Sequence, residues 1–555
     1  MSSRGTAILL HTGARSRGSW EPFPESSREA NHRGQTRRSP AVKFPKGRQG
    51  GRRRPTNVLS TLVRGVLRRP WRVMVVDDQR SWRGFHLLLG ALFVASAIAR
   101  RSSNRRVGIM LPTSGMFPVA TLATWLLGRT AVPLNYLLRT EELRYVITDA
   151  RLDIVITVGP MIERFGELPE GVEPLFLEDI SRRGIPRPRW PRRFTGKSIA
   201  VLIYTSGTSG RPKGVELSSA AMAANVSQCA EWGTVTHRDI FLGVLPQFHC
   251  FGLTVLTLLP LSVGGKVVYT ARFVPRRLFE LMRTHRPTGF VAIPAMYRAM
   301  VADRRATAVD FASFRYLISG GEPLPRALQD AFHARFGTGI NQGYGLTETG
   351  PVVNWCRPED RRPLSVGRAL PDVEERIVDR QGHAVPPGEE GEIIVRGPNL
   401  MSGYLGHADL TAKVIDSEGF FHTGDLGNVD REGFLSITGR LSDLIIVAGE
   451  NVFPAEIEEV LSAHADVKDA AVVGVPDETR GQVPIAFVEL EEGAEFDESG
   501  LRAFCRERLA TYKVPRTVRV IDQLPRTATG KVLRRVLLDL DADTAGGANG
   551  EPAGP

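Results

Sequence analysis

The sequence has few cysteines, few aromatic residues and no apolar run long enough to cross a membrane. Its 555 residues include four cysteines, and 7% of them are aromatic. The cysteines form no CxxC pair and no Cys/His ligand spacing, which argues against a disulfide framework or a zinc ribbon and favours a reducing, cytoplasmic location. A spanning helix needs about 20 apolar residues. The longest runs are 85–99, predicted as a buried helix, and 252–263, predicted to be broken by Pro260.

Acidic residues are scarce at the start of the chain. Residues 1–55 contain 11 Arg, 2 Lys and 3 Glu, so they carry +10 of the net charge of +12. Their composition, rich in Arg, Ser, Gly and Pro, predicts a disordered extension. A dispensable extension, a basic arm that contacts anionic lipid and an organelle presequence all remain open. The rest of the chain has about +2, which argues against a nucleic-acid partner for the whole protein.

From about residue 56, predicted helices alternate with short apolar strands, such as 106–111, 152–158 and 198–204. This alternation predicts an α/β fold with covered sheets. The pattern changes near residue 440, where a separate unit of about 100 residues is expected. The expected division is an extension (1–55), a large domain (56–441), a small domain (442–540) and a disordered tail (541–555).

A loop dense in Gly, Ser and Thr follows the apolar strand at 198–204. It reads TSGTSGRPKG over 205–214. Such a loop suits phosphate binding, because glycines let backbone N–H groups approach oxygens while hydroxyls and a lysine add donors. The Walker A pattern fails, because no Gly directly precedes Lys213 and Gly214 stands where a Ser or Thr would hold magnesium. A generic P-loop nucleotidase is therefore disfavoured.

Five segments in order over more than 300 residues carry a family resemblance. They are YTSGTSGRPKG, GYGLTE (343–348), TGDL (423–426), the Gly-Arg pair at 439–440 with GENVFPAEI (449–457), and PRTATGK (525–531). Together they resemble the adenylate-forming superfamily, which contains acyl-CoA synthetases and other AMP-binding enzymes. The resemblance implies a large N-terminal α/β domain with several sheets and a small, mobile C-terminal α+β domain. It also implies that a carboxylic acid is joined to AMP, pyrophosphate is released, and the acyl group passes to a thiol.

The resemblance assigns phosphate and metal contacts to the loop and to one carboxylate. Thr205 and Glu348 would hold magnesium, which needs only one protein carboxylate when phosphates supply most of its oxygen ligands. The β- and γ-phosphates would be held by Thr205, Ser206, Gly207, Thr208, Ser209, Gly210 and Lys213. Catalytic roles fall to Thr205, Glu348 and Lys531, and Lys531 would bridge the carboxylate and the α-phosphate.

By the same resemblance Tyr344 would stack on adenine, Thr347 would touch the α-phosphate, and Asp425 and Arg440 would hold the ribose. The rest of the nucleotide site would be lined by Gly320, Gly321, Glu322, Asn341, Gln342, Gly343 and Gly345. The small domain would pivot at Ser442, where the family commonly has Lys or Asp, and the loop around Gly449 would line the entry of the thiol.

His249 would border the acyl pocket. No acidic or basic residue in 248–263 offers a partner for the ammonium group of an amino acid, which argues against an amino acid as substrate and favours an apolar acyl chain. The sequence thus predicts a ligase that converts a medium- or long-chain fatty acid to acyl-CoA with ATP, Mg²⁺ and coenzyme A. Within the superfamily the chain looks most like fatty-acid-activating members, including the synthetase half of acyl-carrier-protein synthetase/lysophospholipid acyltransferase proteins. Acyl carrier protein as acceptor and a non-catalytic acyl or nucleotide sensor are the alternatives.

Overall fold

A computed structural model describes residues 57–181, 184, 186, 190, 194–206, 211–526 and 532–546. The predicted extension at 1–55, the loop residues 207–210 and Lys531 lie outside these ranges. The described residues form two compact units. The larger unit runs to Ser442 and also contains Leu524–Val536, and the smaller unit contains Asp443–Gln523 and the chain from Leu537 onward.

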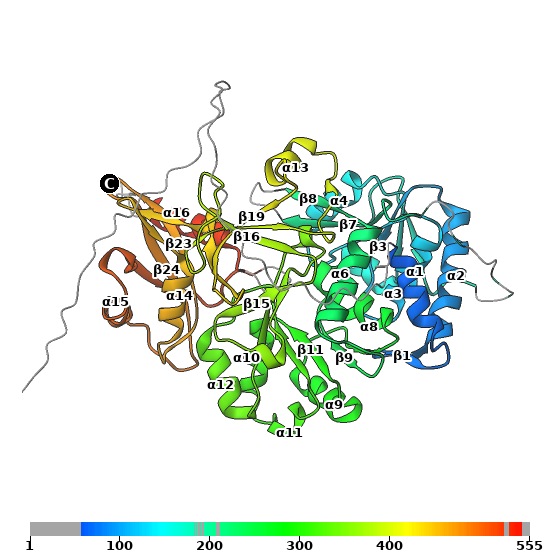
Figure 1. Ribbon diagram of the computed structural model, residues 1–555, viewed down its shortest axis with the longest axis horizontal. Coiled ribbons are helices and arrows are strands. Elements are labelled where there is room, and N and C mark those ends of the chain that lie inside the picture. The colour runs from blue at the N-terminus through cyan, green and yellow to red at the C-terminus, as the bar shows by residue number, and fades with distance from the viewer. Residues whose placement is uncertain are drawn as a thin grey trace, which may run out of the picture. The chain divides into compact units, whose positions relative to one another are not determined.

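A thirteen-stranded sheet is the largest element of the larger unit (Figure 1). Six neighbouring strands, in the order β13-β12-β11-β9-β10-β1, are parallel, and antiparallel strands extend the sheet on both sides. In sheet order the strands are β16 (Glu374–Val378), β17 (Gly391–Arg396), β19 (Phe421–Val429), β20 (Leu435–Arg440), β15 (Ser365–Ala369), β14 (Asn354–Trp355), β13 (Asn341–Tyr344), β12 (Tyr316–Ser319), β11 (Gly289–Ala292), β9 (Ile240–Gly243), β10 (Lys266–Tyr269), β1 (Val73–Val76) and β2 (Ser81–Arg83).

A second, seven-stranded sheet carries the glycine-rich segment. Its strands β7, β4, β3, β5 and β6 are parallel, whereas β8 and β18 are antiparallel to their neighbours. In sheet order they are β18 (Gly403–Tyr404), β8 (Pro212–Ser218), β7 (Ile199–Ser206), β4 (Thr130–Pro133), β3 (Arg106–Ile109), β5 (Ile154–Thr157) and β6 (Glu173–Phe176).

Both sheets are buried on both faces, and successive residues of a strand enter different cores. In β9, Phe241 packs into the core between the sheets, whereas Leu242 packs on the opposite side of the sheet. In β7, Val201 faces the core between the sheets, and Leu202 faces away from it. Because neighbouring side chains of a strand point to opposite faces, a strand covered on both sides must be apolar throughout. This is why the apolar runs of the sequence predicted an α/β fold with covered sheets.

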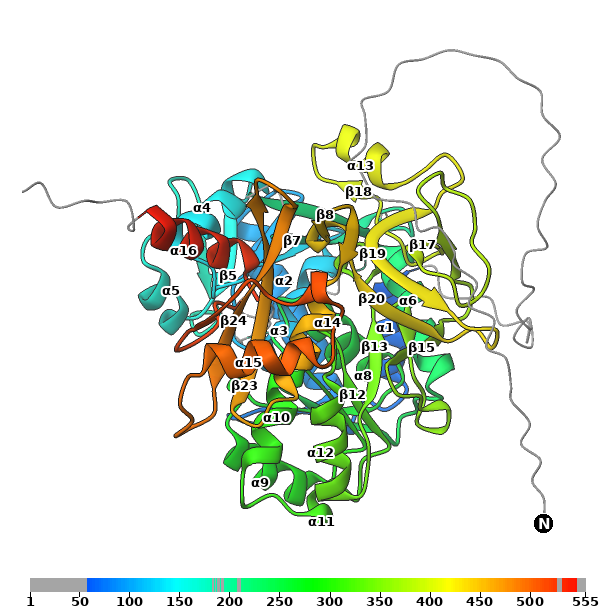
Figure 2. The same ribbon diagram turned by 90° about the vertical axis from the view of Figure 1, so that its left-hand side faces the viewer.

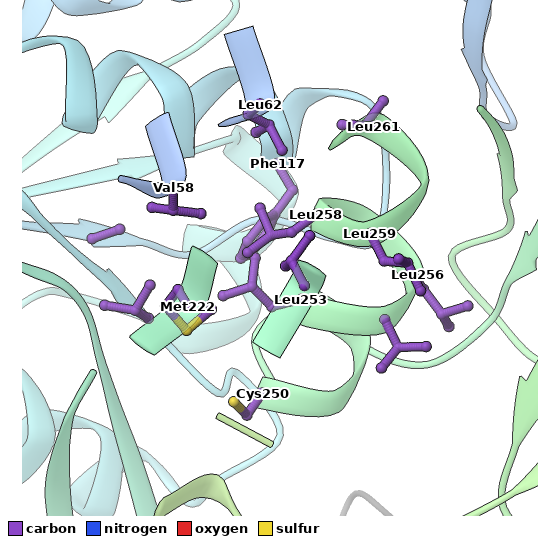
Figure 3. Packing of buried hydrophobic residues seen from close by; sticks show 14 of the residues in the cluster. Val58, Leu62, Phe117, Met222, Cys250, Leu253, Leu256, Leu258, Leu259 and Leu261 are labelled. Carbon is purple, nitrogen blue, oxygen red and sulfur yellow. The ribbon is translucent and has the colours of Figure 1, made fainter. Parts of the chain in front are cut away.

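The core between the two sheets is filled by helices. Side chains from α1, α3, α6, α7 and α8 meet there, as Figure 3 shows for Val58, Phe117, Met222 and Leu253. The helices that contribute to this layer or flank it are α1 (Val58–Leu67), α2 (Gly84–Arg101), α3 (Met116–Leu126), α6 (Ser219–Trp232), α7 (Cys250–Leu253) and α8 (Leu259–Ser262).

Two further groups of helices cover the outer faces of the sheets. The outer face of the large sheet packs on α9 (Pro275–His285), α10 (Pro294–Ala302), α11 (Ala308–Phe311) and α12 (Arg326–Phe336). The outer face of the second sheet packs on α4 (Thr140–Asp149) and α5 (Gly159–Phe165). Beyond these, α13 (Ala408–Val414) adjoins β18 and β19. The larger unit therefore has five layers, alternating helices and sheets.

The segment around Pro260 differs from the sequence prediction. Residues 250–262 remain helical instead of breaking at Pro260, because a π-helical turn, η1 (Thr254–Leu258), joins α7 to α8. Pro260 occupies the first turn of α8. Pro260 thus follows the π-helical turn directly, so the regular i→i−4 hydrogen-bond pattern is already interrupted where proline lacks its N–H.

Helix α2 is the one described helix that is long and apolar enough, by length and composition, to cross a membrane. It packs against α3 and α1. Its inner side is buried through residues such as Leu87, Ala91 and Ile98. The sequence prediction of a buried helix over 85–99 is confirmed for the helix and for its inner side, whereas its outer side, with Leu89, is exposed.

The smaller unit is a five-stranded sheet with helices. Its strands are β22 (Glu450–Val452), β21 (Ile445–Val447), β24 (Gly481–Leu490), β23 (Val467–Asp477) and β25 (Thr517–Val520). Its core packs on α14 (Pro454–Ser462) and α15 (Glu498–Arg506). Helix α16 (Arg534–Gly546) continues past Asp541, where the sequence predicted the tail to begin. An ion pair of 2.6 Å between Arg519 and Asp541 and the burial of Leu537 anchor this helix.

Candidate active site

The predicted nucleotide-binding residues gather where the parallel strands of the large sheet end. Gly320, Gly321 and Glu322 directly follow β12, and the predicted segment 341–344 is its neighbour β13. The side chain of Gln342 accepts a hydrogen bond of 3.3 Å from the backbone N–H of Leu324, which ties the two segments together. Ligands of open α/β sheets bind beyond the carboxyl ends of parallel strands, so this edge is the expected location of a site.

Two glycines at this edge are required by close packing. A Cβ atom on Gly320 would lie 3.0 Å from the ring of Phe251, and one on Gly345 would lie 1.8 Å from the carbonyl oxygen of Pro351. No other residue fits at these positions without moving its neighbours. The contact at Gly320 also brings α7 beside the loop that follows β12.

A three-residue network joins β13 to the hairpin of β19 and β20. The hydroxyl of Tyr344 donates a hydrogen bond of 2.7 Å to Oδ2 of Asp425. Nε of Arg440 lies 2.9 Å from Oδ1 of the same carboxylate. Asp425 and Arg440 are cross-strand partners in β19 and β20, so the sheet register itself places the two side chains together.

The charges of this network are fixed by its surroundings. Burial, together with the negative charge of Asp425, raises the pKa of Tyr344 well above its ordinary value. The phenol therefore remains a hydrogen-bond donor at neutral pH. Each hydrogen bond to the carboxylate is worth about 1.5–3 kcal/mol, as is typical when one partner is charged. Asp425 is thus held rigidly at the edge of the candidate site.

The predicted phosphate and metal residues lie on two adjoining segments. Thr205 and Lys213 are cross-strand partners in the hairpin of β7 and β8. Glu348 belongs to η2 (Thr347–Thr349), and its Oε1 accepts a hydrogen bond of 3.0 Å from the hydroxyl of Tyr404. The Nζ atom of Lys213 lies 5.9 Å from the centre of the Tyr404 ring. Tyr404 therefore connects the lysine of the loop to the carboxylate.

Backbone hydrogen bonds hold Tyr404 in this position. Strand β18 pairs with β8, and the N–H of Leu405 donates to the carbonyl of Gly214 over 2.8 Å. The N–H of Met401 donates to the carbonyl of Glu348 over 2.7 Å. Tyr404 was not among the residues predicted from the sequence. It lies in the motif GYLG (403–406), whose two glycines indicate a constrained turn, but the motif indicates no particular chemistry.

His249 caps the amino end of α7. Its Nδ1 accepts a hydrogen bond of 3.3 Å from the N–H of Phe251. Burial lowers the pKa of His249 to about 4, so the ring is neutral at pH 7. The neutral imidazole therefore places no charge beside Phe251, whose ring lies against Gly320.

Other predicted residues have different surroundings. The side chain of Asn341 is buried and accepts a hydrogen bond of 3.0 Å from Arg361, which gives it a structural partner. Glu322 forms an ion pair of 3.6 Å with Arg526, which belongs to the same compact unit. Gly449 lies in the smaller unit, in the turn between β21 and β22. Among the described residues, no group of three or more His, Cys, Asp or Glu side chains could hold a metal ion.

Comparison with known proteins agrees with this arrangement. Residues 63–405 match the family of AMP-binding enzymes, and residues 456–531 match the AMP-binding enzyme C-terminal domain. A long-chain-fatty-acid–CoA ligase of Bacillus subtilis is 31% identical over 83% of this chain and 90% of its own length. An indoleacetate–CoA ligase of Aromatoleum aromaticum is 36% identical over 80% of this chain and 89% of its own length.

A solved structure shares the fold of this chain. ATP-bound MatB from Rhodopseudomonas palustris superimposes with a TM-score of 0.80 and 31% identity, covering 88% of this chain and 99% of that one. The chain belongs to the family of AMP-binding enzymes, and its fold is that of adenylate-forming enzymes. Within that family it is an acid–CoA ligase, which uses ATP and coenzyme A and proceeds through an acyl adenylate.

Proposed function

We propose that this ligase activates a medium- or long-chain fatty acid to acyl-AMP and then forms acyl-CoA. The observation that carries the substrate class is the segment from Phe248 to Val263. It contains no acidic or basic residue except His249 at its start, whose pKa is lowered by burial. The ammonium group of an amino acid would find no carboxylate partner there, whereas an apolar chain needs none. Similarity to a long-chain-fatty-acid–CoA ligase supports the same choice, and similarity to an indoleacetate–CoA ligase makes an aromatic acid the main competitor.

The first half-reaction brings a carboxylate toward a triphosphate, so the enzyme has to position like charges and neutralise them. In the proposal Tyr344 stacks on adenine, while the carboxylate of Asp425 accepts hydrogen bonds from the ribose hydroxyls. Asp425 suits this role because Arg440 and Tyr344 already orient it. The loop of 205–210 and Lys213 hold the β- and γ-phosphates, and Thr347 touches the α-phosphate.

Magnesium is part of the proposal. The donors available at the site are oxygens, namely the Glu348 carboxylate and the Thr205 hydroxyl, and the described residues contain no larger acidic cluster there. This set fits Mg²⁺, which takes oxygen ligands and is commonly bound through one or two carboxylates and the phosphates of its substrate. When bound, the ion would neutralise charge on the phosphates. Glu348 is oriented for the task by Tyr404.

The second half-reaction transfers the acyl group to a thiol. In the proposal the C-terminal domain expected at 442–540 turns about Ser442 between the two half-reactions, so that Lys531 serves adenylation and the loop at Gly449 serves thiol entry. The division between the two compact units falls between Ser442 and Asp443, which supports this choice of pivot. Coenzyme A is the proposed acceptor, and acyl carrier protein is the alternative.

Product analysis tests the proposal. The purified chain is incubated with ATP, Mg²⁺ and an equimolar mixture of short, medium and long fatty acids, indoleacetate and an amino acid, with either coenzyme A or acyl carrier protein. Mass spectrometry of the thioesters should show medium- or long-chain acyl-CoA as the main product. A dominant indoleacetyl product would reject the fatty-acid assignment, and thioesters formed only on the carrier protein would reject coenzyme A. Absence of ATP–pyrophosphate exchange with every acid would favour a non-catalytic sensor.

A further inference from the structure

The folded part of the chain is close to neutral overall, but its positive charge is distributed unevenly along the sequence. Residues 57–140 contain 12 Arg, no Lys and two acidic residues, Asp77 and Asp78, and therefore carry +10. No acidic residue occurs between 79 and 140. The rest of the chain after residue 140 has more acidic than basic residues. Because residues 1–55 also carry +10, positive charge is concentrated in the first quarter of the chain.

The same stretch exposes large apolar side chains beside its arginines. Trp71, in the loop before β1, is 69% exposed, and Leu89, on the outer side of α2, is 41% exposed. Single exposed apolar side chains are common on monomeric proteins, whereas a contiguous apolar patch rimmed by polar residues marks a contact surface. We call the surface formed by Trp71 and the outer side of α2 the α2 face.

The α2 face is a continuous and firmly built surface. The ring centres of Trp71 and Phe85 lie 4.9 Å apart. The N–H of Phe85 donates to the carbonyl of Pro70 over 2.8 Å, and the Arg83 side chain donates to the carbonyl of Trp71 over 2.9 Å. These contacts fix the loop to the amino end of the helix. Helical spacing then continues the apolar side from Phe85 through Leu89 to Phe93.

Exposed arginines flank this apolar surface before α2 and at both of its ends. Exposed arginines stand at 68, 69 and 83, before or at the start of α2, and at 100 and 101, in its last turn. Burial and, after it, the positive charges of Arg80 and Arg83 lower the pKa of His86, and burial followed by the charge of Arg69 lowers the pKa of Arg72. An anionic surface would relieve this repulsion.

Figure 1 places α2 at the margin of the larger unit, where α1 and α3 cover it from the inner side. None of the residues assigned to the candidate active site lies within 57–140. Figure 1 also shows α2 apart from β19, the strand that carries Asp425, so the α2 face is separate from the nucleotide-binding edge.

We propose that the α2 face docks on the surface of a membrane that contains anionic phospholipid. Arginines bind the headgroups, while Trp71, Phe85 and Leu89 enter the boundary between headgroups and acyl chains. Exposed tryptophan and leucine side chains flanked by arginines are typical of interfacial binding. Nucleic acid would match the charge but gives the exposed apolar side chains no partner, which is why lipid is the preferred occupant. Helix α2 lies on the membrane in this proposal and does not cross it, because its inner side is buried in the protein.

Vesicle binding by the full-length chain tests the proposal. Sedimentation with vesicles of phosphatidylcholine mixed with phosphatidylglycerol should recover the protein at low salt, and vesicles of phosphatidylcholine alone should recover much less. The variant Arg68→Gln/Arg69→Gln should bind about tenfold or more weakly, since each arginine near an anionic surface contributes about fivefold in affinity. The variant Trp71→Ser/Leu89→Ser should also bind about tenfold more weakly.

Two matched control variants remove charge or exposed apolar side chains outside the α2 face. Arg304→Gln/Arg326→Gln removes the same charge from another part of the larger unit. Val274→Ser/Val309→Ser removes apolar side chains that are 46% and 82% exposed near α9 and α11. Both control variants should bind vesicles as the unchanged chain does, and all four variants should keep their ATP–pyrophosphate exchange without vesicles.

Three results would overturn the proposal. The first is equal vesicle binding by the α2-face variants and the unchanged chain. The second is binding that depends only on residues 2–55, seen as complete loss on their deletion with no effect of the α2-face variants. The third is tighter binding to duplex DNA than to anionic vesicles, which would assign the basic stretch to nucleic acid.

Discussion

The hydroxyl of Tyr404 donates a hydrogen bond of 3.0 Å to the carboxylate of Glu348, although 56 residues separate the two in the chain. The neighbouring positive charge of Lys213 lies 5.9 Å from the same aromatic ring. The carboxylate proposed to hold magnesium is thus oriented by a residue from a different segment. Burial and the charge of Glu348 raise the pKa of Tyr404, so its proton stays available for this hydrogen bond.

Replacing Tyr404 with Phe is expected to weaken Mg²⁺ binding more than it lowers the maximal rate of pyrophosphate exchange. The variant loses one hydrogen bond to a ligating carboxylate, and such outer contacts usually contribute 10–100-fold to metal affinity, so the Mg²⁺ concentration for half-maximal pyrophosphate exchange should rise about tenfold. The rate at saturating Mg²⁺ should change little. Tyr204→Phe is the control, because its hydroxyl donates to the Asp149 carboxylate over 2.5 Å and not to Glu348. An unchanged Mg²⁺ requirement with a lower maximal rate would contradict this role.

The Asp425→Asn variant tests ribose binding. Losing the charged acceptor should raise the KM for ATP about 10–100-fold, the range for a hydrogen bond to a charged group. With 2′,3′-dideoxy-ATP the unchanged enzyme and the variant should have similar KM values, because the ribose hydroxyls are then missing. Asp430→Asn is the matched control, since Asp430 pairs with Arg362 at 2.6 Å outside the candidate site. A defect of equal size with both nucleotides would indicate a purely structural role for Asp425.

The Lys531→Ala variant should separate the two half-reactions. In the proposed mechanism this lysine neutralises charge between the attacking carboxylate and the α-phosphate, and it has no part in thiol attack. ATP–pyrophosphate exchange should fall below detection, while acyl-CoA formation from supplied acyl-AMP should remain close to that of the unchanged enzyme. Equal loss of both activities would refute this assignment.

A Ser442→Pro variant should have the opposite effect. Proline fixes the backbone φ angle, so it restricts the turn that the smaller unit is proposed to make between half-reactions. Pyrophosphate exchange should persist, and thioester formation from acyl-AMP should fall by about a hundredfold, a magnitude typical of lost positioning. Ser442→Ala, which leaves the backbone free, should retain both activities. Full thioester formation in the proline variant would move the pivot elsewhere.

His249 should make the fold sensitive to acid. Its folded pKa is about 4 against an ordinary 6.5, so the unfolded chain binds a proton first as the pH falls. The stabilising contribution is therefore complete above about pH 6.5 and is lost as the pH decreases toward 4. Near pH 5.5 the loss should reach about 1 kcal/mol of unfolding free energy.

The matched variant His249→Asn keeps an acceptor for the Phe251 N–H and removes the titrating group. Urea unfolding near pH 7.5 and near pH 5.5 should show a smaller pH effect in this variant than in the unchanged chain. His383→Asn, at a position 79% exposed, should leave the pH effect as it was. An equal loss of unfolding free energy between the two pH values in His249→Asn and in the unchanged chain would contradict this role of His249.

Much of the fold could be predicted from the sequence because local patterns report it directly. The apolar runs at 106–111, 152–158 and 198–204 correspond to β3, β5 and β7. The π-helical turn before Pro260 and the extension of α16 past Asp541 could not be predicted, because both depend on packing and ion pairs with distant residues.

The sequence by itself determined the order of chemical groups along the chain, the family resemblance and the uneven charge. Only the tertiary structure decided which groups meet. Sheet register placed Arg440 beside Asp425, and strand pairing of β18 with β8 carried Tyr404 to Glu348. The fold also determined that Trp71 and Leu89 stay exposed whereas Leu87 is buried. These outcomes depend on contacts between residues far apart in the chain, and local sequence patterns contain no information about such contacts.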